Sequence, residues 1–331
     1  MSNITLEPKA CRICNGTSLD FFVAREMMYG LRESFSYFEC ASCKCVQISE
    51  YPADMARHYP SNYYAYAPQP EAAQQGTIGR LKAVARSLAM GSGVIRNAWL
   101  QMPSNRSWIA KQANLKFYVE RFRDPSARML DVGCGAGELL RNLRLVGFKN
   151  AEGIDPYIES DVVHQGRTLV WKRHLSEMAP SYQCISFHHS LEHMPGQAEV
   201  IAEARRLLAP GGVIIIRIPI VGKEAWRVYR ENWVQLDPPR HFYLHSEASL
   251  RLLAQQCGLV VDEIVYDSYG LQIWGSELYL KDIPLLDERS PARGSHAIFS
   301  SEELAGFDRH AADLNAASDG DQVMAILRAP S

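Results

Sequence analysis

A short apolar segment followed at once by a glycine-rich turn constrains the fold of this chain more than any other feature. Residues 127–131 form an apolar run of strand length, residues 133–137 read Gly-Cys-Gly-Ala-Gly, and residues 138–146 have a helical pattern. Strand, glycine turn and helix in this order form the first unit of a nucleotide-binding α/β fold. A dinucleotide fingerprint needs its third glycine where this chain has Glu138, so we do not expect a pyrophosphate at this turn.

The acidic residues around the turn favour a different ligand, S-adenosylmethionine (SAM), which carries an ammonium, a sulfonium and one carboxylate but no phosphate. Asp131, just before the glycines, suits the ammonium, and the glycines let the backbone approach the amino-acid moiety closely. A second apolar segment, 151–154, is followed by Asp155, whose carboxylate can accept hydrogen bonds from both hydroxyls of an adenosine ribose. The predicted cofactor-binding residues are Asp131, Gly133, Gly135, Gly137 and Asp155.

The rest of the chain extends this pattern. Further strands are predicted at 181–187, 213–218, 259–265 and 323–327, and helices at 196–208 and 246–256. Residues 268–320 read as an insertion that is helical at 301–315. We therefore predict an α/β, Rossmann-like sheet for the C-terminal two thirds of the chain.

Five of the eight cysteines lie in the first 45 residues. Two C-x-x-C pairs, Cys11/Cys14 and Cys40/Cys43, have the spacing of a zinc ribbon, in which each pair occupies a tight knuckle and presents two thiolates to one metal. We predict one structural zinc held by these four residues. Cys45 lies just beyond the second pair, and either it is a bystander or it replaces Cys43 as a ligand.

A connector follows the cysteines. Residues 51–70 are rich in Tyr and Pro and form either a packing loop or a stacking surface for a sugar or base. Residues 72–119 hold seven Lys or Arg and no Asp or Glu, with apolar residues at helical spacing. Such a pattern is typical of a solvated helix face, or of a surface that contacts anionic lipid or a phosphorylated substrate; weak contact with acidic membranes is assigned to 76–119.

The overall charge of the chain makes one function class, nucleic-acid binding, less favoured. The formal net charge is −2, which gives no general attraction for nucleic acid. Nothing in the sequence reads as a transmembrane segment or signal peptide, so we expect a cytoplasmic protein in which cysteines serve as ligands or core residues.

The motifs resemble those of class I SAM-dependent methyltransferases over about residues 125–265, and more weakly over 322–329. The matching segments are Asp131–Gly137, Asp155, Leu191–His193 and Leu208–Gly212. This resemblance implies a seven-stranded sheet with a reversed final hairpin and SAM at the carboxyl ends of the first two strands. The four cysteines, with Asp237–His241 and Ser246–Leu250, look like a subgroup with a zinc module, related to bacterial methyltransferases of deoxysugar and surface-polysaccharide pathways.

Two departures from the family narrow the expected activity. The family often has an acidic residue after the third strand, but this chain reads Trp171-Lys-Arg-His-Leu175, so no adenine-binding carboxylate is assigned. Sugar C-methyltransferases carry Tyr-x-Glu-His where this chain has Pro238 and Arg240, although His241 remains. Methylation at oxygen or nitrogen is therefore favoured over methylation at carbon.

A hydroxyl acceptor must lose its proton during transfer, and neutral His is a suitable base near pH 7. His241 is the first candidate, Glu192 and His193 are the alternative, and His188 and His245 read as structural. Arg240 is expected to clamp a phosphate or carboxylate of the acceptor, and His189 is assigned to the cofactor.

The expected organisation is a zinc module at 1–55, a linker and basic segment at 56–125, and a methyltransferase domain at 126–331. The favoured function is methyl transfer to a small-molecule or glycan acceptor, in particular a sugar or sugar nucleotide. A nucleic-acid-directed methyltransferase that binds through the zinc module, and a SAM-binding pseudoenzyme or scaffold, are the alternatives.

Overall fold

A computed structural model describes residues 8–60, 98, 100–102 and 113–330 of the chain. Most of the basic segment 76–119 and the second half of the segment 51–70 lie outside these residues, so the expectations for them stay predictions. Within the described residues, no helix is both long enough and apolar enough to cross a membrane.

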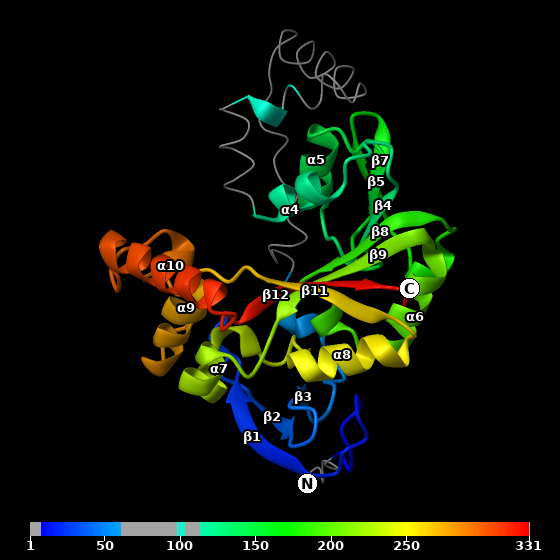
Figure 1. The fold of residues 1–331 in the computed structure, drawn as a ribbon. Coiled ribbons are helices and arrows are strands. Elements are labelled where there is room, and N and C mark those ends of the chain that lie inside the picture. The colour runs from blue at the N-terminus through cyan, green and yellow to red at the C-terminus, as the bar shows by residue number, and fades with distance from the viewer. Residues whose placement is uncertain (1–7, 61–97, 99, 103–112, 331) are drawn as a thin grey trace. The chain divides into compact units, whose positions relative to one another are not determined.

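The predicted α/β class is confirmed by a mixed sheet of order β11-β12-β9-β8-β4-β5-β7-β6 (Figure 1). Its strands are β4 (Met129–Val132), β5 (Ala151–Ile154), β6 (Val162–His164), β7 (Arg167–Trp171), β8 (Tyr182–His188), β9 (Leu208–Pro219), β11 (Val260–Tyr266) and β12 (Gln322–Arg328). Strands β8, β4, β5 and β7 are parallel neighbours. The final strand, β12, runs antiparallel to β11, which is the reversed hairpin that the resemblance implies.

The sheet has eight strands where seven were expected. The additional strand is β6, which pairs antiparallel with β7. Gln165 and Gly166 connect them, and both have positive φ, of 51° and 75°. Two consecutive residues with positive φ form the tight turn whose twist suits a two-residue hairpin. Gln165 is not a residue that marks such a turn, which is why the hairpin was missed.

Helices connect and cover the strands. They are α4 (Ala113–Arg121), α5 (Glu138–Leu145), α6 (Gln197–Leu207), α7 (Glu224–Tyr229), α8 (Glu247–Gln256), α9 (Leu271–Leu280) and α10 (Ser301–Ala316). The helix expected at 301–315 is α10, which begins after Ser300, whose side chain accepts a hydrogen bond from the Glu303 N–H. Short 3-10 helices lie at Ala56–His58, Leu175–Glu177, Leu191–His193, Arg230–Asn232, Val234–Leu236 and Pro291–Arg293.

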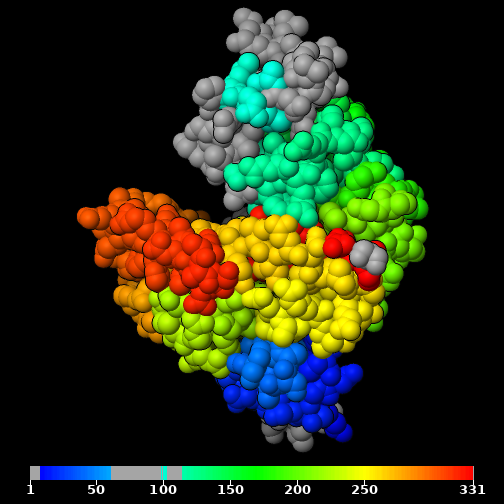
Figure 2. Space-filling view, viewed as in Figure 1, coloured from blue at the N-terminus to red at the C-terminus, as the bar shows by residue number. Residues whose placement is uncertain are grey.

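The N-terminal segment forms a second, antiparallel sheet of order β1-β2-β3-β10. Its strands are β1 (Leu19–Arg25), β2 (Ser34–Cys40), β3 (Val46–Ile48) and β10 (Tyr243–Leu244). The last strand comes from a part of the chain about 200 residues away and pairs Tyr243 with Gln47 and Leu244 with Val46. Figure 2 shows the N-terminal segment and the segment around α8 in one continuous surface.

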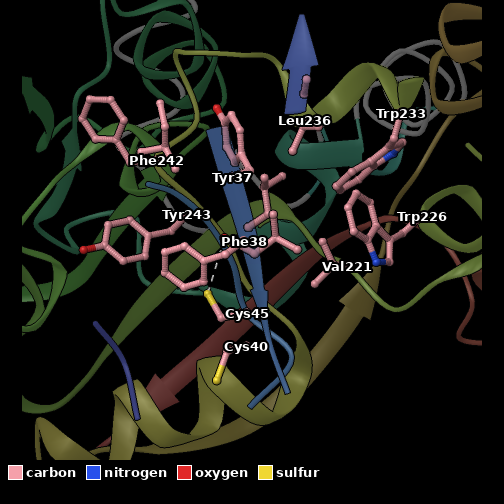
Figure 3. Close-up of a cluster of buried hydrophobic side chains, with 14 of the residues drawn as sticks. Tyr37, Phe38, Cys40, Cys45, Val221, Trp226, Trp233, Leu236, Phe242 and Tyr243 are labelled. Atoms are coloured by element: carbon pink, nitrogen blue, oxygen red, sulfur yellow. Dashed lines mark hydrogen bonds between the residues drawn. The ribbon is translucent and has the colours of Figure 1, made fainter. Parts of the chain in front are cut away.

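The compact units of the structure differ from the expected domains. One unit comprises residues 1–59, 189–201 and 216–331, and the other 60–188 and 202–215. The first 55 residues share a core with the later segments of their unit: Tyr37 and Phe38 are packed with Trp226, Trp233 and Phe242, among others (Figure 3). The small sheet thus buries its apolar face against aromatic residues of the later segments, with which it forms one core.

Candidate active site and cysteine cluster

The glycine turn follows β4 as predicted. Gly133, Gly135 and Gly137 have φ of 71°, 52° and 78°, a region that side chains with a Cβ rarely adopt. Gly137 precedes α5, and a Cβ there would lie 2.7 Å from Cγ2 of Val170. Both backbone conformation and space therefore require glycine at 137.

Two buried carboxylates accompany the turn in the same unit. Asp131 accepts a hydrogen bond from the Ser186 hydroxyl at 2.7 Å. Asp155 accepts hydrogen bonds from the backbone N–H of Gly135 at 3.0 Å and of Tyr157 at 2.9 Å. Asp155 thus fixes the turn to the end of β5, so the structure brings together five of the six residues predicted to bind the cofactor; the sixth, His189, is in the other unit.

Burial makes both carboxylates reluctant to ionise. It raises the pKa of Asp131 to about 7, and the nearby charge of Asp155 adds to this shift while the Ser186 hydrogen bond opposes it. Burial also raises the pKa of Asp155, against the two backbone N–H donors. A cationic group beside these carboxylates favours their ionised form. Its binding should therefore strengthen as the pH rises and Asp131 ionises.

In the other unit, a line of polar contacts leads to Glu192. Asp267 forms an ion pair with Arg217, with 2.6 Å between Oδ2 and Nε. Arg217 Nη1 donates to His189 Nε2 at 2.8 Å, which leaves the proton of neutral His189 on Nδ1, 3.3 Å from Glu192 Oε1. His189, predicted to bind the cofactor, thus has both ring nitrogens occupied by Arg217 and Glu192.

Glu192 is fully buried beside His193 and His241. Burial opposes its ionisation, but the hydrogen bond from His189 and the electrostatic influence of the neighbouring imidazoles lower the pKa of Glu192 to about 2. Its second oxygen, Oε2, has no hydrogen-bond partner among the described residues. An ionised carboxylate with a free oxygen is available to a group that arrives beside it.

Two histidines, His193 and His241, lie next to Glu192. His241 Nδ1 lies 2.7 Å from the Gln235 carbonyl oxygen, and His193 Nδ1 lies 2.8 Å from that of Arg240. A carbonyl only accepts, so both Nδ1 atoms carry the proton and both Nε2 atoms have the lone pair. His241 Nε2 lies 4.0 Å from Glu192 Oε1, and the two imidazole centroids are 4.7 Å apart.

The buried environment keeps His241 neutral. Burial lowers the pKa of His241 to about 4, while the Asp237 and Glu192 carboxylates oppose the shift. His241 is therefore in the unprotonated form that a general base needs over the whole neutral range.

The expected role of Arg240 as an acceptor clamp is contradicted by its surroundings. Its side chain is completely buried. Nε donates to Asp237 at 2.8 Å, and Nη2 lies 2.5 Å from the same carboxylate and 3.0 Å from Glu26. Glu26 in turn accepts hydrogen bonds from the backbone N–H of Tyr29 and Leu31. Arg240 is thus committed to two internal carboxylates, and no phosphate or carboxylate of an acceptor reaches it.

Two other histidines that were considered from the sequence, His245 and His188, form hydrogen bonds away from Glu192. His245 donates and accepts through both ring nitrogens, with Ser249 at 2.9 Å and Gln197 at 2.7 Å, and is fully buried. His188 Nε2 lies 2.9 Å from the Tyr118 hydroxyl. Both arrangements agree with structural roles.

The four predicted ligand cysteines converge. Their sulfur atoms all lie within 4.8 Å of one another, with 3.6 Å between Cys11 and Cys43 and 3.5 Å between Cys14 and Cys40. The sulfur of Cys45 points to the Val46 carbonyl oxygen at 3.7 Å and is outside the cluster, so Cys43 and not Cys45 completes the set.

The two knuckles share one backbone pattern. Cys11 N–H donates to the Gly16 carbonyl and Asn15 N–H to that of Cys11; Cys40 N–H donates to Cys45 and Lys44 N–H to Cys40 in the same way. Asn15 and Lys44 both have φ near 60°. The sequence anticipates the first of these turns through Asn15-Gly16, whereas nothing local marks Lys44.

The chain is similar to known methyltransferases over part of its length. A family model described as a methyltransferase domain matches residues 102–264. The chain is 28% identical over 187 residues to a ubiquinone biosynthesis O-methyltransferase of Pseudomonas aeruginosa (strain UCBPP-PA14), covering 51% of this chain and 75% of that relative. It is 29% identical over 112 residues to the enzyme of the same name from Xanthomonas axonopodis pv. citri (strain 306), covering 31% and 47%.

Among solved structures, a SAM-dependent methyltransferase from Archaeoglobus fulgidus aligns with a TM-score of 0.43 at 19% identity, over 66% of this chain and 92% of that one. The domain match, the sheet order and the glycine turn together define this chain as a SAM-dependent methyltransferase.

Several residues of the site were missed from the sequence. Glu26 contacts Arg240, and Arg217 contacts His189 and is paired with Asp267. None of the three belongs to a local motif. Asp237 stands within the quoted segment 237–241 and forms the main ion pair of Arg240. A pair of opposite charges three residues apart, at 237 and 240, is the one signal that favoured an internal ion pair.

Proposed function

We propose that this enzyme transfers the SAM methyl group to a hydroxyl of a small molecule, with a sugar or sugar nucleotide as the acceptor class. Three observations support oxygen as the acceptor atom. His241 has a neutral, lone-pair-bearing Nε2 beside ionised Glu192, Arg240 replaces the Glu of the C-methylating pattern, and the relatives are named O-methyltransferases. The sugar class rests on the resemblance of the cysteine pairs and of segment 237–241.

On the cofactor side, Asp131 binds the ammonium of SAM, the glycine turn lies against its amino-acid end, and Asp155 accepts hydrogen bonds from the ribose hydroxyls. Each Asp155 oxygen accepts one backbone N–H and keeps a second lone pair for a hydroxyl. His189 lies at the exit of β8 with φ of 49°, and we retain it as a cofactor contact through its backbone.

SAM supplies an activated methyl group, so the protein needs chiefly to align the acceptor and remove its proton. The His241 Nε2 takes the hydroxyl proton as the oxygen attacks the methyl carbon, and the bond between that carbon and sulfur breaks, which leaves S-adenosylhomocysteine. Glu192 stabilises the imidazolium that forms. The observation that carries this assignment is the Nδ1 hydrogen bond to Gln235, which fixes the tautomer and aims Nε2 at Glu192. His193 has the same tautomer and is the competing base.

Arg240 acts in this proposal as a positioning residue. Its backbone carbonyl accepts the hydrogen bond that orients His193, and its side chain holds residues 237–241 against Glu26 of the N-terminal segment. The segment 237–241, which carries His241, is thereby fixed by buried ion pairs.

The four cysteines fit a structural zinc. A tetrahedral ion with Zn–S bonds of about 2.3 Å places its sulfur atoms about 3.8 Å apart, close to the 3.5 and 3.6 Å of the two closest pairs. Backbone N–H groups of Ile13 and Gly16 point at the sulfurs of Cys11 and Cys14, which stabilises thiolates. The ion would hold the two knuckles together and thereby fix β1–β3.

The test is transfer of labelled methyl from SAM to pools of sugar nucleotides, phenols and amines, compared between wild type and His241→Ala. Labelling of a hydroxyl product that falls strongly in His241→Ala supports the proposal. Labelling only of amines, or equal rates in both proteins, contradicts it. A dead His193→Ala beside an active His241→Ala would move the base to His193.

A further inference from the structure

A hollow in the unit that carries the glycine turn has no part in the chemistry described above. Its volume is 440 Å³, and it is lined by Arg128, Arg144, Lys149, Asn150, Glu152, Arg167, Thr168 and Trp171. Arg128, Lys149 and Arg167 lie at the beginnings of the parallel strands β4, β5 and β7, whereas Asp131 and Asp155 lie where β4 and β5 end. The hollow is therefore at the opposite end of these strands from the cofactor carboxylates.

Four cationic side chains line the hollow together with a single carboxylate, and that carboxylate is already engaged. Glu152 accepts hydrogen bonds from the indole N–H of Trp171 at 3.0 Å and from the Tyr182 hydroxyl at 2.9 Å. It lies 3.6 Å from Nη2 of Arg128. Glu152 pairs with Arg128 and its charge also favours the charged form of Arg144, so one carboxylate faces four cations.

Arg144 is held in place beside a second cation, Arg167. Its Nε donates to the Ala151 carbonyl at 2.8 Å and its Nη2 to that of Thr168 at 2.8 Å, so the guanidinium is fixed between β5 and β7. Burial, and next the charge of Arg167, lower the pKa of Arg144. A bound anion would reduce the electrostatic repulsion between these two neighbouring guanidinium groups.

Lys149 and Arg167 make no ion pair or side-chain hydrogen bond with any residue that the structure describes. Elsewhere in the described chain, cations such as Lys223, Arg227 and Arg217 have carboxylate partners at 2.6–2.7 Å. The formal net charge of the chain is −2, so a cluster of unpaired cations is a local feature and does not reflect a generally basic chain. Their grouping indicates a local demand for negative charge.

We propose that this hollow is a binding site for a small anion with two or more linked phosphate groups. Four cations facing one carboxylate carry more positive charge than one phosphate needs, and the volume of about 440 Å³ is that of a small-molecule site. Inorganic polyphosphate and the phosphate chain of a nucleotide share this chemistry. The site is separate from the methyl-transfer site, and its existence does not depend on the proposed acceptor.

The first experiment is calorimetric titration of the full chain with tripolyphosphate, with sulfate at matched ionic strength as the reference. We expect saturable binding of one tripolyphosphate per chain. Lys149→Gln/Arg167→Gln should weaken it by at least about tenfold, because two charge-assisted contacts are lost. Both residues lack partners, so this variant should keep the thermal unfolding midpoint and the SAM affinity of the wild type.

The matched control is Lys9→Gln/Arg309→Gln, which removes two exposed cations of the other unit and should leave tripolyphosphate binding unchanged. Equal weakening by the control pair, or tripolyphosphate heats no larger than those of sulfate, would overturn the proposal. ATP and adenosine distinguish the sources: binding of both ATP and tripolyphosphate supports the site, and adenosine should not bind there. Binding of an RNA oligonucleotide without any binding of tripolyphosphate would also overturn it.

Discussion

The cofactor turn and the Glu192–His193–His241 cluster are built in two different ways. Asp131, the glycines and Asp155 lie within 25 residues, and their geometry follows from one strand-turn-helix unit and the next strand. The histidine cluster combines residues 192–193 with 237–241, and it is fixed by contacts to Glu26 and Arg217. A local site is set by backbone conformation, whereas an assembled site depends on buried polar contacts between distant segments. Different substitutions should therefore disrupt the cofactor turn and the histidine cluster.

The largest effect should come from breaking the cysteine cluster, on which the assembled site depends through β1–β3 and β10. Chelator-free protein should contain about one zinc per chain, and Cys11→Ser/Cys14→Ser should lose it together with cooperative unfolding of the N-terminal sheet, because a structural zinc site contributes about 10 kcal/mol or more in small modules. Elemental analysis and thermal unfolding measure this. Wild-type protein from zinc-replete cells without any metal would contradict the assignment.

A smaller effect should come from Arg240, whose removal leaves Glu26 and Asp237 buried without their partner. Arg240→Met should lower the free energy of unfolding by about 3–5 kcal/mol. Chemical denaturation measures the change. Adding Glu26→Gln to Arg240→Met should recover part of the loss, and a double variant no more stable than Arg240→Met would count against the buried ion pair as the cause.

The smallest of these effects concerns the pH dependence of the local site. The pKa of Asp131 is raised to about 7 in the free enzyme, so its contribution to folding is favourable when protonated and is lost as the pH rises through 7. Binding of the SAM ammonium needs the charged form. SAM affinity should therefore fall by up to about tenfold per pH unit below 7. Calorimetry between pH 5.5 and 8 measures this.

The control is Asp131→Asn, which should bind SAM more weakly but with most of the pH dependence removed. Its thermal stability without SAM should also lose the decline that Asp131 causes as the pH rises. An unchanged pH profile in Asp131→Asn would assign the titration to another group.

The same contrast explains what could be predicted from the sequence. The strands, the glycine turn, both carboxylates and the four-cysteine cluster follow from local patterns, because each pattern fixes its own backbone. The partners of Arg240 could not be predicted, since a charged residue beside His241 in a loop reads equally as an acceptor clamp and as an internal ion pair. Strand β10 has two residues and is defined by its pairing with β3, which no local pattern shows.

The central claim is that cofactor binding and proton removal belong to separate sets of residues. The most direct measurement is SAM affinity by calorimetry and methyl-transfer turnover at saturating SAM, both on Asp155→Ala and His241→Ala, with His296→Ala as an exposed control. Asp155→Ala should weaken SAM binding by about 1–3 kcal/mol through the lost hydrogen bonds. His241→Ala should keep wild-type SAM affinity and lose about 10²–10⁴-fold in turnover. Wild-type SAM affinity in a folded Asp155→Ala, or near-full turnover in His241→Ala, would contradict the account.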